Sequence, residues 1–453
     1  MKKVHFIAIG GAVMHNLALA LHQKGFTVTG SDDEFFEPSK SRLANAGLLP
    51  DETGWHAERI TSDLDAVILG MHAREDNPEL VEARRLGIKV YSFPEYLYEQ
   101  TKSKTRVVIG GSHGKTTTTS MIMHVLRTLG KDFDYMVGAQ IEGFETMVRL
   151  TDEAPVAIFE GDEYLSSPLD LTPKFHRYKP HVALLTGIAW DHINVFPTWD
   201  NYVSQFATFA STIEPDGALV YFDGDKELCN IADNVRSDVR TLPYGGLTYT
   251  LDGDATVATY NDTDYRINLF GKHNMQNMHG AMLACQQIGI APEEFLKAIE
   301  TFSGAAKRLQ KLKETPTSVA YLDFAHSPSK LKATTEAVRE RYPKRKLVAV
   351  MELHTFSSLT KAFLPQYAHT MDAADVAYVY FNPEVVAHKR LEEFDVSAVE
   401  EAFCNSRLKV YTDSAALKDE ILNIDYADSV LLIMTSGNFS GIDIRELAET
   451  AIK

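Results

Sequence analysis

Residues 106–117 read Arg106-Val107-Val108-Ile109-Gly110-Gly111-Ser112-His113-Gly114-Lys115-Thr116-Thr117, and they indicate the fold class more strongly than any other segment. The apolar residues are typical of a buried strand, and a helical pattern follows the glycines to about Gly130. A glycine loop between a strand and a helix points backbone N–H groups at phosphate oxygens. In such a loop Lys115 supplies a charge for the outer phosphates, and the Thr116 hydroxyl supplies a Mg²⁺ ligand. This segment therefore predicts nucleotide binding in a parallel α/β sheet.

The loop departs from the strict GxxxxGK[ST] pattern, because Ile109 stands where the first glycine belongs. The alternative is a plain glycine turn with threonines capping the helix. The flanking strand and helix favour a nucleotide-binding loop.

Acidic and imidazole side chains follow two further predicted strands of the same segment. Glu160-Gly161-Asp162-Glu163 comes directly after strand 155–159, and Asp191-His192 follows strand 181–186. The carboxyl ends of parallel strands meet at one edge of a sheet, where the Mg²⁺ of a nucleotide would lie. Taken singly, the acids could be a surface turn and His192 a structural histidine. Their shared edge with Lys115 favours a site.

The residues before the loop predict a separate, doubly wound parallel sheet. Strands are expected at 3–9, 26–30, 66–69 and 88–91, with helices after Gly11 and at 78–86. The polar residues 101–104 are typical of a linker. Gly10-Gly11 and Asp32 are a weak dinucleotide signal, because a third glycine is missing. A nucleotide diphosphate site and a plain tight turn both remain open here, and NAD is poorly supported.

The loop and the residues after it predict a central region and a further C-terminal region. Three α/β domains therefore follow in series: 1–103, 104–302 and 303–453. In the central domain we expect another strand at 217–222, a small antiparallel patch within 240–270, and helices at 274–288 and 292–301. The last domain has strand patterns at 318–323, 346–351, 375–380, 408–411 and 429–434, and helical patterns at 328–341, 361–371 and 414–421.

Composition excludes several classes of protein. The 453 residues carry a net charge of −17, so counterion release at a nucleic-acid backbone is an improbable source of binding energy. Three cysteines without metal spacing argue against a disulfide framework. The N-terminal apolar run is too short for a signal peptide, and no run is long enough to cross a membrane. We expect a cytoplasmic protein, a monomer or weak homodimer, that neither binds nucleic acid nor enters a membrane.

Taken together, six motifs resemble those of the Mur ligases of peptidoglycan assembly, in the family order and over essentially the whole chain. Gly111–Thr117 is similar to their ATP loop, Glu160–Glu163 to their acidic motif, and Asp191-His192 to their DH pair. The later motifs are Gly271-Lys272-His273-Asn274-Met275-Gln276-Asn277, Lys307-Arg308 and Asp323-Phe324-Ala325-His326-Ser327-Pro328. Each of these has a structural alternative on its own: a capped helix start, a solvated charge pair and an Asx turn.

The resemblance implies a UDP-sugar domain that is Rossmann-like, a central P-loop ATPase domain with a mixed sheet, and a Rossmann-like acceptor domain. It implies that ATP and Mg²⁺ convert a carboxylate into an acyl phosphate, which an amine attacks to form an amide, with ADP and phosphate released. It assigns catalysis to Lys115, Glu160 and His192, and metal binding to Thr116, Glu160 and His192. The expected ATP-binding residues are Gly111, Ser112, His113, Gly114, Lys115, Thr116, Thr117, Asn274, Asn277, Arg308, Asp323 and His326.

The N-terminal residues resemble members that use UDP-N-acetylmuramate itself, and Gly10, Gly11, Met14, Ser31 and Asp32 are its expected contacts. No lysine occurs between Lys179 and Lys226, so the carbamoylated lysine of other members is missing from its expected segment. Two kinds of member then remain, one adding L-alanine and one, the murein peptide ligases, adding the recycled tripeptide L-alanyl-γ-D-glutamyl-meso-diaminopimelate.

The third domain favours the tripeptide. Alanine-adding members carry H-R-x-x-R where this chain has His354-Thr355-Phe356-Ser357-Ser358, so both arginines are absent. The stretch Met434–Gly441 resembles the M-S-x-G-x-F-x-G pattern of the peptide ligases, and Glu37-Pro38-Ser39 and Pro173-Lys174-Phe175 point the same way. We expect His354, Ser436, Gly437 and Asn438 to contact a peptide acceptor.

Three other functions fit the sequence less well. A folylpolyglutamate-type ligase shares the ATP loop and DH pair but has no need of the Gly10-Gly11 domain. A non-catalytic UDP-sugar sensor would have lost Lys115, Glu160 or His192. A dehydrogenase would require a better glycine fingerprint.

Overall fold

The structure is a computed structural model that describes residues 2–71, 73–252 and 255–453. Its chain forms two compact units. One comprises the residues up to Ile188 together with Val203–Gly245 and Gly280–Ala298, and the other comprises Ala189–Tyr202, Gly246–His279 and Ile299–Lys453. No described helix is long and apolar enough to cross a membrane.

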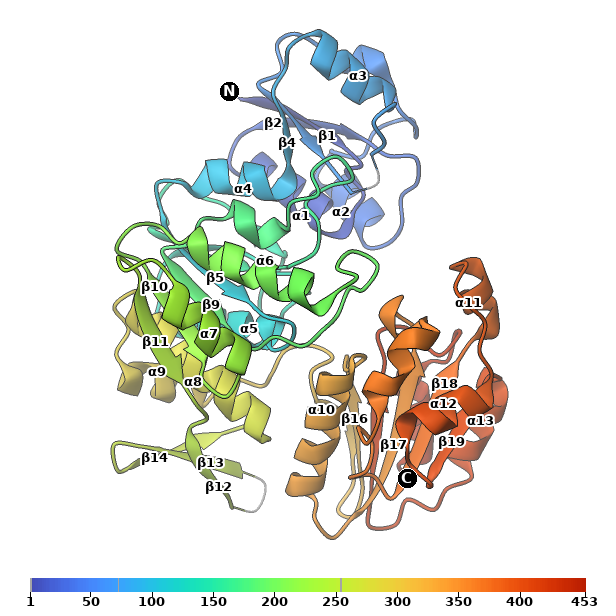
Figure 1. The fold of residues 1–453 in the computed structure, drawn as a ribbon. Coiled ribbons are helices and arrows are strands. Elements are labelled where there is room, and N and C mark those ends of the chain that lie inside the picture. Colours follow the sequence, from blue (N-terminus) through green and yellow to red (C-terminus); the bar gives the residue numbers. More distant parts are fainter. Residues whose placement is uncertain (1, 72, 253–254) are drawn as a thin grey trace. The chain divides into compact units, whose positions relative to one another are not determined.

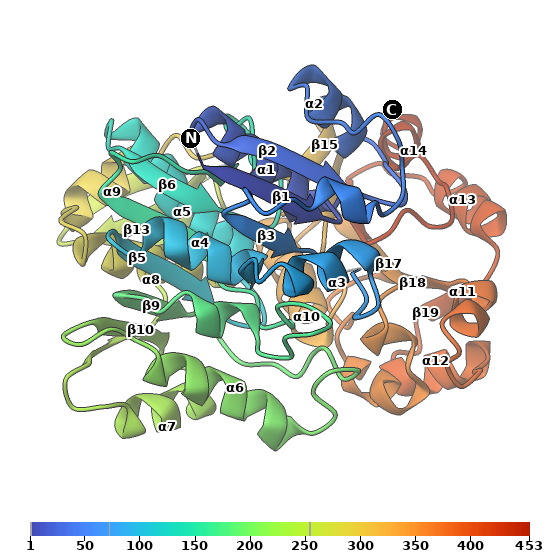
Figure 2. The same ribbon diagram turned by 90° about the horizontal axis from the view of Figure 1, so that it is seen from above.

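The N-terminal sheet is parallel and has the order β2-β1-β3-β4. The strand β1 lies between β2 and β3 and pairs with both (Figure 2). The strand β3 (Ala66–Leu69) forms because four apolar residues in a row can be buried on both faces. The other elements are β1 (Lys3–Ile7), β2 (Thr27–Ser31), β4 (Val90–Ser92), α1 (Ala12–Gln23), α2 (Ser39–Asn45), the 3₁₀ turn η1 (Ala57–Arg59), α3 (Pro78–Arg85) and α4 (Phe93–Thr101).

The central sheet has seven strands in the order β11-β10-β9-β5-β8-β6-β7, and all neighbours are parallel except β6 and β7. Figure 1 labels its strands β5, β9, β10 and β11. The strand β5 (Thr105–Gly110) lies between β8 (Val156–Glu160) and β9 (Val182–Leu185), so the glycine loop opens where the connections diverge to either side. Ligands of open α/β sheets bind at such a point. The remaining strands are β6 (Phe133–Met136), β7 (Val148–Arg149), β10 (Ala218–Phe222) and β11 (Arg240–Tyr244).

Helices and one small sheet complete this part of the chain. The antiparallel patch expected within 240–270 is confirmed as β12 (Thr248–Asp252), β13 (Ala255–Tyr260) and β14 (Thr263–Ile267), and residues 253–254 of that range lie outside the described chain. The helices are α5 (Lys115–Thr128), α6 (Trp199–Ser211), α7 (Lys226–Asn234), α8 (Lys272–Gln286) and α9 (Pro292–Ile299), with the 3₁₀ turn η2 (Lys174–Arg177).

The C-terminal sheet has the order β15-β16-β20-β17-β18-β19 and is parallel apart from the edge strand β15. Apolar side chains cover both faces: α10, α12 and η4 pack on one face, and α13 and α14 on the other. The elements are β15 (Gln310–Glu314), β16 (Val319–Asp323), α10 (Pro328–Arg341), β17 (Lys346–Leu353), η3 (Ser357–Leu359), η4 (Lys361–Tyr367), β18 (Val376–Phe381), α11 (Pro383–His388), α12 (Val396–Phe403), β19 (Leu408–Tyr411), α13 (Ser414–Leu422), β20 (Ser429–Met434) and α14 (Ile444–Ala451).

Two sequence predictions are wrong in local detail. The helix expected at 361–371 is the 3₁₀ segment η4, and Pro365 inside it removes an N–H donor that an α-helix needs. The polar residues 101–104 are not a free linker, because Lys104 is buried and its ammonium lies 2.6 Å from the carboxylate of Asp134. The three-domain α/β architecture itself is confirmed, whereas the boundaries 1–103, 104–302 and 303–453 remain predictions.

Candidate active site

The glycine loop is shaped by two residues with positive φ. Gly111 has φ of +134°, and a Cβ built there would lie 2.1 Å from the Thr186 hydroxyl oxygen, so a side chain does not fit. Gly114 has φ of +79° and caps the start of α5. Because both positions suit glycine alone, the loop can bring its backbone close to a ligand.

Lys115 is held by two oxygen acceptors. Its ammonium donates to the Gly111 carbonyl and to Glu163 Oε2, both at 2.6 Å. Burial opposes the charge, but the carboxylates of Glu163, Asp162 and Glu160 outweigh it and raise the pKa of Lys115 above its usual value. The lysine is therefore charged at neutral pH and poised beside the loop.

Thr116 and Glu160 form an oxygen pair at the end of β8. The Thr116 hydroxyl donates to Glu160 Oε1 at 2.9 Å, and the Gly138 N–H donates to Glu160 Oε2 at 3.0 Å. Two hard oxygen donors beside a phosphate loop fit Mg²⁺, which takes few protein ligands and keeps water or phosphate oxygens. Among the described residues, no group of three or more His, Cys, Asp and Glu side chains could hold a metal.

The Asp191-His192 pair belongs to the other compact unit. Asp191 Oδ1 accepts from the His192 N–H at 2.8 Å and from the Ser357 hydroxyl at 3.2 Å, and its Oδ2 lies 4.0 Å from His326 Nε2. Burial disfavours the carboxylate, but the nearby charges of His192 and Lys330 and the His192 N–H hold the pKa of Asp191 at about 2. The expected place of His192 beside Lys115 and Glu160 stays a prediction.

The other residues expected to bind ATP lie in this second unit too. Asn274 donates to the Phe270 carbonyl at 2.8 Å, and Asn274 and Asn277 are both buried on α8. Asp323 accepts from the N–H groups of Leu309 and Ala325, each at 2.7 Å, and so fixes the start of the C-terminal sheet. The Arg308 guanidinium lies 4.8 Å from the centre of the Phe324 ring.

His326 is neutral in its buried position. Desolvation, helped by the charge of Lys330, lowers its pKa to about 3, although Asp191 opposes the shift. Its Nδ1 lies 2.8 Å from the Phe324 carbonyl oxygen.

The residues expected to contact the acceptor surround a buried carboxylate at the ends of β17 and β20. Glu352 accepts from the Thr435 hydroxyl and lies 3.7 Å from His354 Nδ1. The Gly437 N–H donates to Thr435 Oγ1 at 2.7 Å. The Ser436 hydroxyl is buried without a hydrogen-bond partner among the described residues, and Asn438 is exposed.

The loop of residues 435–441 uses several of its polar groups in contacts within the protein. The N–H groups of Gly437 and Gly441 donate within the loop, whose residues Phe439 and Ser440 have left-handed backbone conformations. Ser440 Oγ accepts from the Tyr380 hydroxyl and from the Asn382 amide, which both lie outside the loop.

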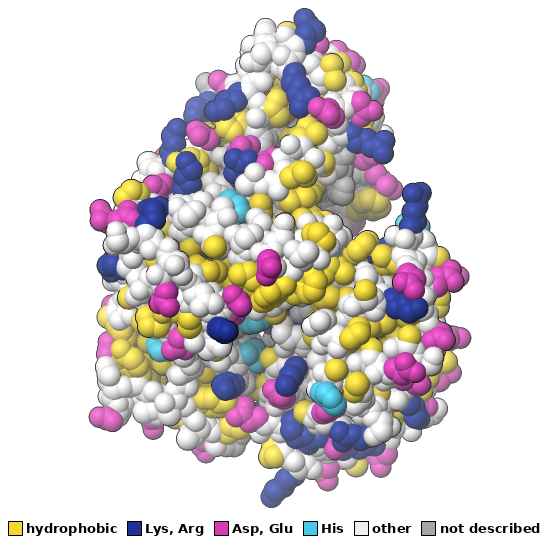
Figure 3. Space-filling view, viewed as in Figure 1, with side chains coloured by type: hydrophobic (Ala, Val, Ile, Leu, Met, Phe, Trp, Pro, Cys, Tyr) yellow, Lys and Arg dark blue, Asp and Glu magenta, His cyan; other side chains and the backbone are white. Residues whose placement is uncertain are grey.

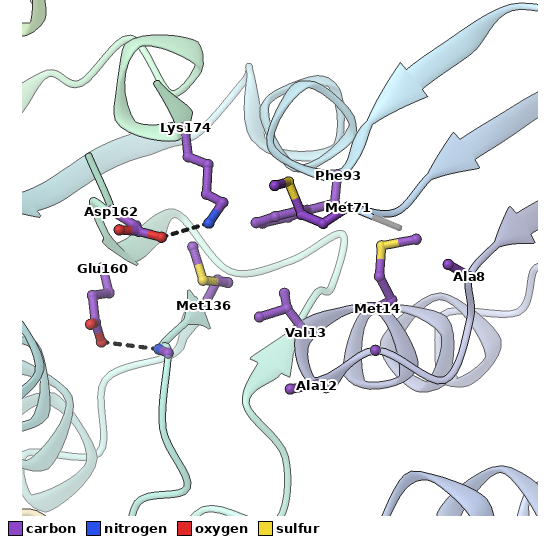
Figure 4. A pocket seen from close by; sticks show the side chains of 12 residues that line it. Ala8, Ala12, Val13, Met14, Met71, Phe93, Met136, Glu160, Asp162 and Lys174 are labelled. Carbon is purple, nitrogen blue, oxygen red and sulfur yellow. Dashed lines mark hydrogen bonds and ion pairs between the residues drawn. The ribbon is translucent and has the colours of Figure 1, made fainter. Parts of the chain in front are cut away.

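A cavity of about 380 Å³ lies in the first unit, between the N-terminal end of α1 and the carboxyl ends of β6 and β8 (Figure 4). Gly11 and Met14 line one side, and Glu160 and Asp162 line the other. Gly10 donates its N–H to Asp32 Oδ2 at 2.7 Å, and burial raises the pKa of Asp32 to about 6. The Ser31 hydroxyl donates to the buried Glu79 at 2.5 Å.

Comparison with known proteins places the chain. Three family models match it in series: the Mur ligase family catalytic domain at residues 3–105, the Mur ligase middle domain at 109–285, and the Mur ligase glutamate ligase domain at 307–437. A UDP-N-acetylmuramate–L-alanine ligase of Levilactobacillus brevis is 30% identical over 392 residues, which cover 83% of this chain and 82% of the relative. The chain belongs to the Mur ligase family. Like other Mur ligases, it is an ATP-dependent ligase that forms amide bonds.

Solved structures resemble this Mur ligase over two thirds of its length or more. A murein peptide ligase from Psychrobacter arcticus has a TM-score of 0.66 at 23% identity and covers 100% of this chain and 99% of its own. The tripeptide ligase from Neisseria meningitidis has a TM-score of 0.60 at 25% identity over 67% of this chain and 98% of its own. A UDP-N-acetylmuramate–alanine ligase from Thermotoga maritima has a TM-score of 0.69 at 21% identity, covering 100% and 98%.

Sequence reasoning missed two polar contacts of the Mur ligase site. Glu163 belongs to the acidic motif, but the motif does not predict its ion pair with Lys115. Lys174 belongs to a stretch that resembles peptide ligases, and that resemblance does not predict its ion pair with Asp162, at 2.6 Å in the cavity. The sequence does not single out Lys174, because His176, Arg177 and Lys179 follow within five residues.

Proposed function

We propose that this Mur ligase joins UDP-N-acetylmuramate to the tripeptide L-alanyl-γ-D-glutamyl-meso-diaminopimelate, in the cytoplasm, as a step of peptidoglycan recycling. ATP, bound with Mg²⁺, transfers its γ-phosphoryl group to the muramyl carboxylate and leaves as ADP. The peptide amine then attacks the acyl phosphate and displaces phosphate. The products are the amide, ADP and phosphate.

The residues of the first unit support the phosphoryl-transfer half of this reaction. Phosphoryl transfer needs positioned positive charge and little covalent help from the protein. Lys115 is charged, only 14% exposed and adjacent to the loop, so it can neutralise charge that builds up on the transferring group. Thr116 and Glu160 would hold Mg²⁺. The sugar nucleotide would bind at Gly10, Gly11, Met14, Ser31 and Asp32. Two of these residues, Gly11 and Met14, line the same cavity as Glu160.

The proposed roles in the second unit rest on the family motifs and on local geometry. His192 would contribute to the metal site. Asn274 and Asn277 would contact adenine, while Arg308, Asp323 and His326 would lie near the ribose and phosphates. His354, Ser436, Gly437 and Asn438 would meet the acceptor.

The choice of a peptide acceptor rests on one observation at the start of η3. Thr355 and Ser358 stand where alanine-adding ligases carry arginines, and their hydroxyls are 3.0 Å apart, with Thr355 Oγ1 also accepting from the Ser358 N–H at 3.2 Å. Ser358 is fully buried. A single alanine needs a cation close to its carboxylate, and these hydroxyls supply none. A tripeptide, which spans roughly 10 Å when extended, carries its carboxylates elsewhere.

L-alanine is the second candidate acceptor, because the curated relatives with 29–30% identity carry the name UDP-N-acetylmuramate–L-alanine ligase. One coupled assay of ADP release separates the two, with UDP-N-acetylmuramate and Mg·ATP plus either acceptor. The tripeptide is expected to exceed L-alanine by several orders of magnitude in kcat/KM. A preference for L-alanine would reverse the assignment.

A further inference from the structure

The cavity between α1 and β8 is apolar apart from three charged side chains. Its described lining residues are Ala8, Gly11, Ala12, Val13, Met14, Met71, Phe93, Met136, Gly138, Glu160, Asp162 and Lys174. Two of the charged groups are carboxylates, and the only cation among these lining residues is Lys174. An anionic ligand would therefore be attracted by one side chain of this cavity, that of Lys174.

Lys174 is held in place while its ammonium faces the cavity. Its backbone N–H donates to the Tyr164 carbonyl at 2.9 Å, and Pro173 bridges to Leu165, which fixes the start of η2. The ammonium lies 5.6 Å from the centre of the Tyr164 ring and 5.8 Å from that of Phe93. Figure 4 shows the ammonium directed at Asp162, with Phe93, Met71 and Met136 close by.

The ammonium keeps donor capacity for a ligand. A lysine carries three N–H donors. Its one hydrogen-bond acceptor among the described residues is Asp162 Oδ2, at 2.6 Å. The side chain is 13% exposed, so these donors lie in a largely dry site where a charge-assisted bond is strong.

The chemistry of the acyl donor fits this arrangement. A sugar nucleotide bound at Gly11 and Met14, whose carboxylate reacts near Glu160, must cross this cavity. The carboxylate of the ligand would enter beside the carboxylates of Glu160 and Asp162. Neighbouring carboxylates repel one another unless a cation lies close to them.

We propose that Lys174 binds the carboxylate of the acyl donor, and so distinguishes UDP-N-acetylmuramate from the same sugar nucleotide without its lactyl group. This inference rests on the proposed function. Lys174 is a specificity-determining residue, with Asp162 as the partner that orients it.

Binding to the nucleotide-free enzyme tests the proposal with two ligands that differ in the lactyl carboxylate. The affinities of UDP-N-acetylmuramate and UDP-N-acetylglucosamine are measured by calorimetry for the wild type and for Lys174→Met. The weaker ligand is measured in a displacement titration against the tighter one. We expect Lys174→Met to weaken UDP-N-acetylmuramate about 10–100-fold, the value of a charge-assisted hydrogen bond, and to change UDP-N-acetylglucosamine less than about twofold. Lys174→Arg should recover part of the loss.

Two more variants complete the design. Lys226→Met makes the same charge change at an exposed position and should leave both affinities unchanged. Asp162→Asn removes a competing charge beside the lysine and should strengthen UDP-N-acetylmuramate binding, which keeps the test decisive if Lys174→Met fails to fold. Equal loss of both ligands in Lys174→Met, no loss of either, or weaker UDP-N-acetylmuramate binding in Asp162→Asn would overturn the proposal. If the wild type binds neither ligand, the proposed function itself fails.

Discussion

Lys115 combines a proposed catalytic role with a structural one, and one substitution will affect both. Lys115→Ala should lower the rate of ADP release by about 10³-fold or more, because the charge that meets the phosphoryl group is lost. It should also lower the melting temperature, because Glu163, whose side chain is 1% exposed, loses its ion-pair partner at 2.6 Å.

The double variant Lys115→Ala/Glu163→Gln separates the two effects. We expect it to regain part of the lost thermal stability and none of the activity. Near-normal ADP release by a folded Lys115→Ala enzyme would contradict the assignment of this lysine.

Asp32 should make the stability of the first unit depend on pH. Burial is the main cause that raises its pKa to about 6, and the Gly10 N–H opposes the shift. A carboxyl with a higher pKa in the folded than in the unfolded chain binds its proton more tightly when folded. Its contribution to stability is therefore fully present below about pH 4 and is lost as the pH rises to 6.

Asp32→Asn removes that penalty and keeps an oxygen that can accept from Gly10. The free energy of unfolding should rise by roughly 1–3 kcal/mol at pH 7.5 and by less than about 1 kcal/mol at pH 4.5. Urea unfolding at the two pH values measures the difference. An equal effect at both pH values would show that ionisation of Asp32 is not responsible.

At the scale of single elements, Asp225 connects a helix to a strand. Its Oδ1 caps α7 by accepting from the N–H groups of Glu227 and Leu228, and its Oδ2 accepts from the Ile188 N–H at 2.6 Å, just beyond β9. Asp413 makes the same type of cap on α13, with bonds of 2.8 and 3.2 Å, and is exposed.

Asp225→Ala should therefore cost more than Asp413→Ala. We expect about 1 kcal/mol for the cap alone at Asp413 and roughly 2–3 kcal/mol at Asp225, where the Ile188 N–H also loses its acceptor. Urea unfolding of both variants provides the comparison. Equal losses would mean that the bond to Ile188 adds nothing to stability.

Most strands could be predicted because their residues bury both faces of a parallel sheet. The run Ser429–Met434 is entirely buried and was predicted with its bounds, whereas 361–371 was expected to be α-helical because its apolar spacing outweighed Pro365. The loop, Thr116 and Glu160 were also predictable, since strand ends of one sheet share an edge. The pairs Lys115–Glu163 and Lys174–Asp162 were not, because spacing along the chain does not show how a loop folds back.

For the whole molecule, the proposed separation of the sugar-nucleotide site from the Mg·ATP site can be tested by measuring how each ligand stabilises the fold. A ligand at 100 times its Kd stabilises the folded state by about 2.7 kcal/mol. Glu160→Gln and His192→Ala should keep the rise in melting temperature caused by UDP-N-acetylmuramate and lose most of that caused by Mg·ADP. Loss of the UDP-N-acetylmuramate effect with an unchanged Mg²⁺ dependence would show that the roles are wrongly divided.

At the scale of the whole molecule, the chain carries a net charge of −17. Figure 3 shows acidic and basic side chains interspersed over the face in view. The binding energy for an anionic sugar nucleotide must therefore come from a few positioned groups, as the cavity around Lys174 illustrates, and not from a broad field.

The interleaving of the two compact units constrains how the chain is made. The polypeptide passes from one unit to the other after residues 188, 202, 245, 279 and 298. Residues 189–202 and 246–279 therefore leave the ribosome before most of the unit they join has been synthesised, and they must wait for the C-terminal sheet. A fragment that begins at residue 299 would lack both segments, including Asp191, which accepts from Ser357. Expression of residues 307–437 alone, which match the Mur ligase glutamate ligase domain, would thus remove the acceptor of the Ser357 hydroxyl.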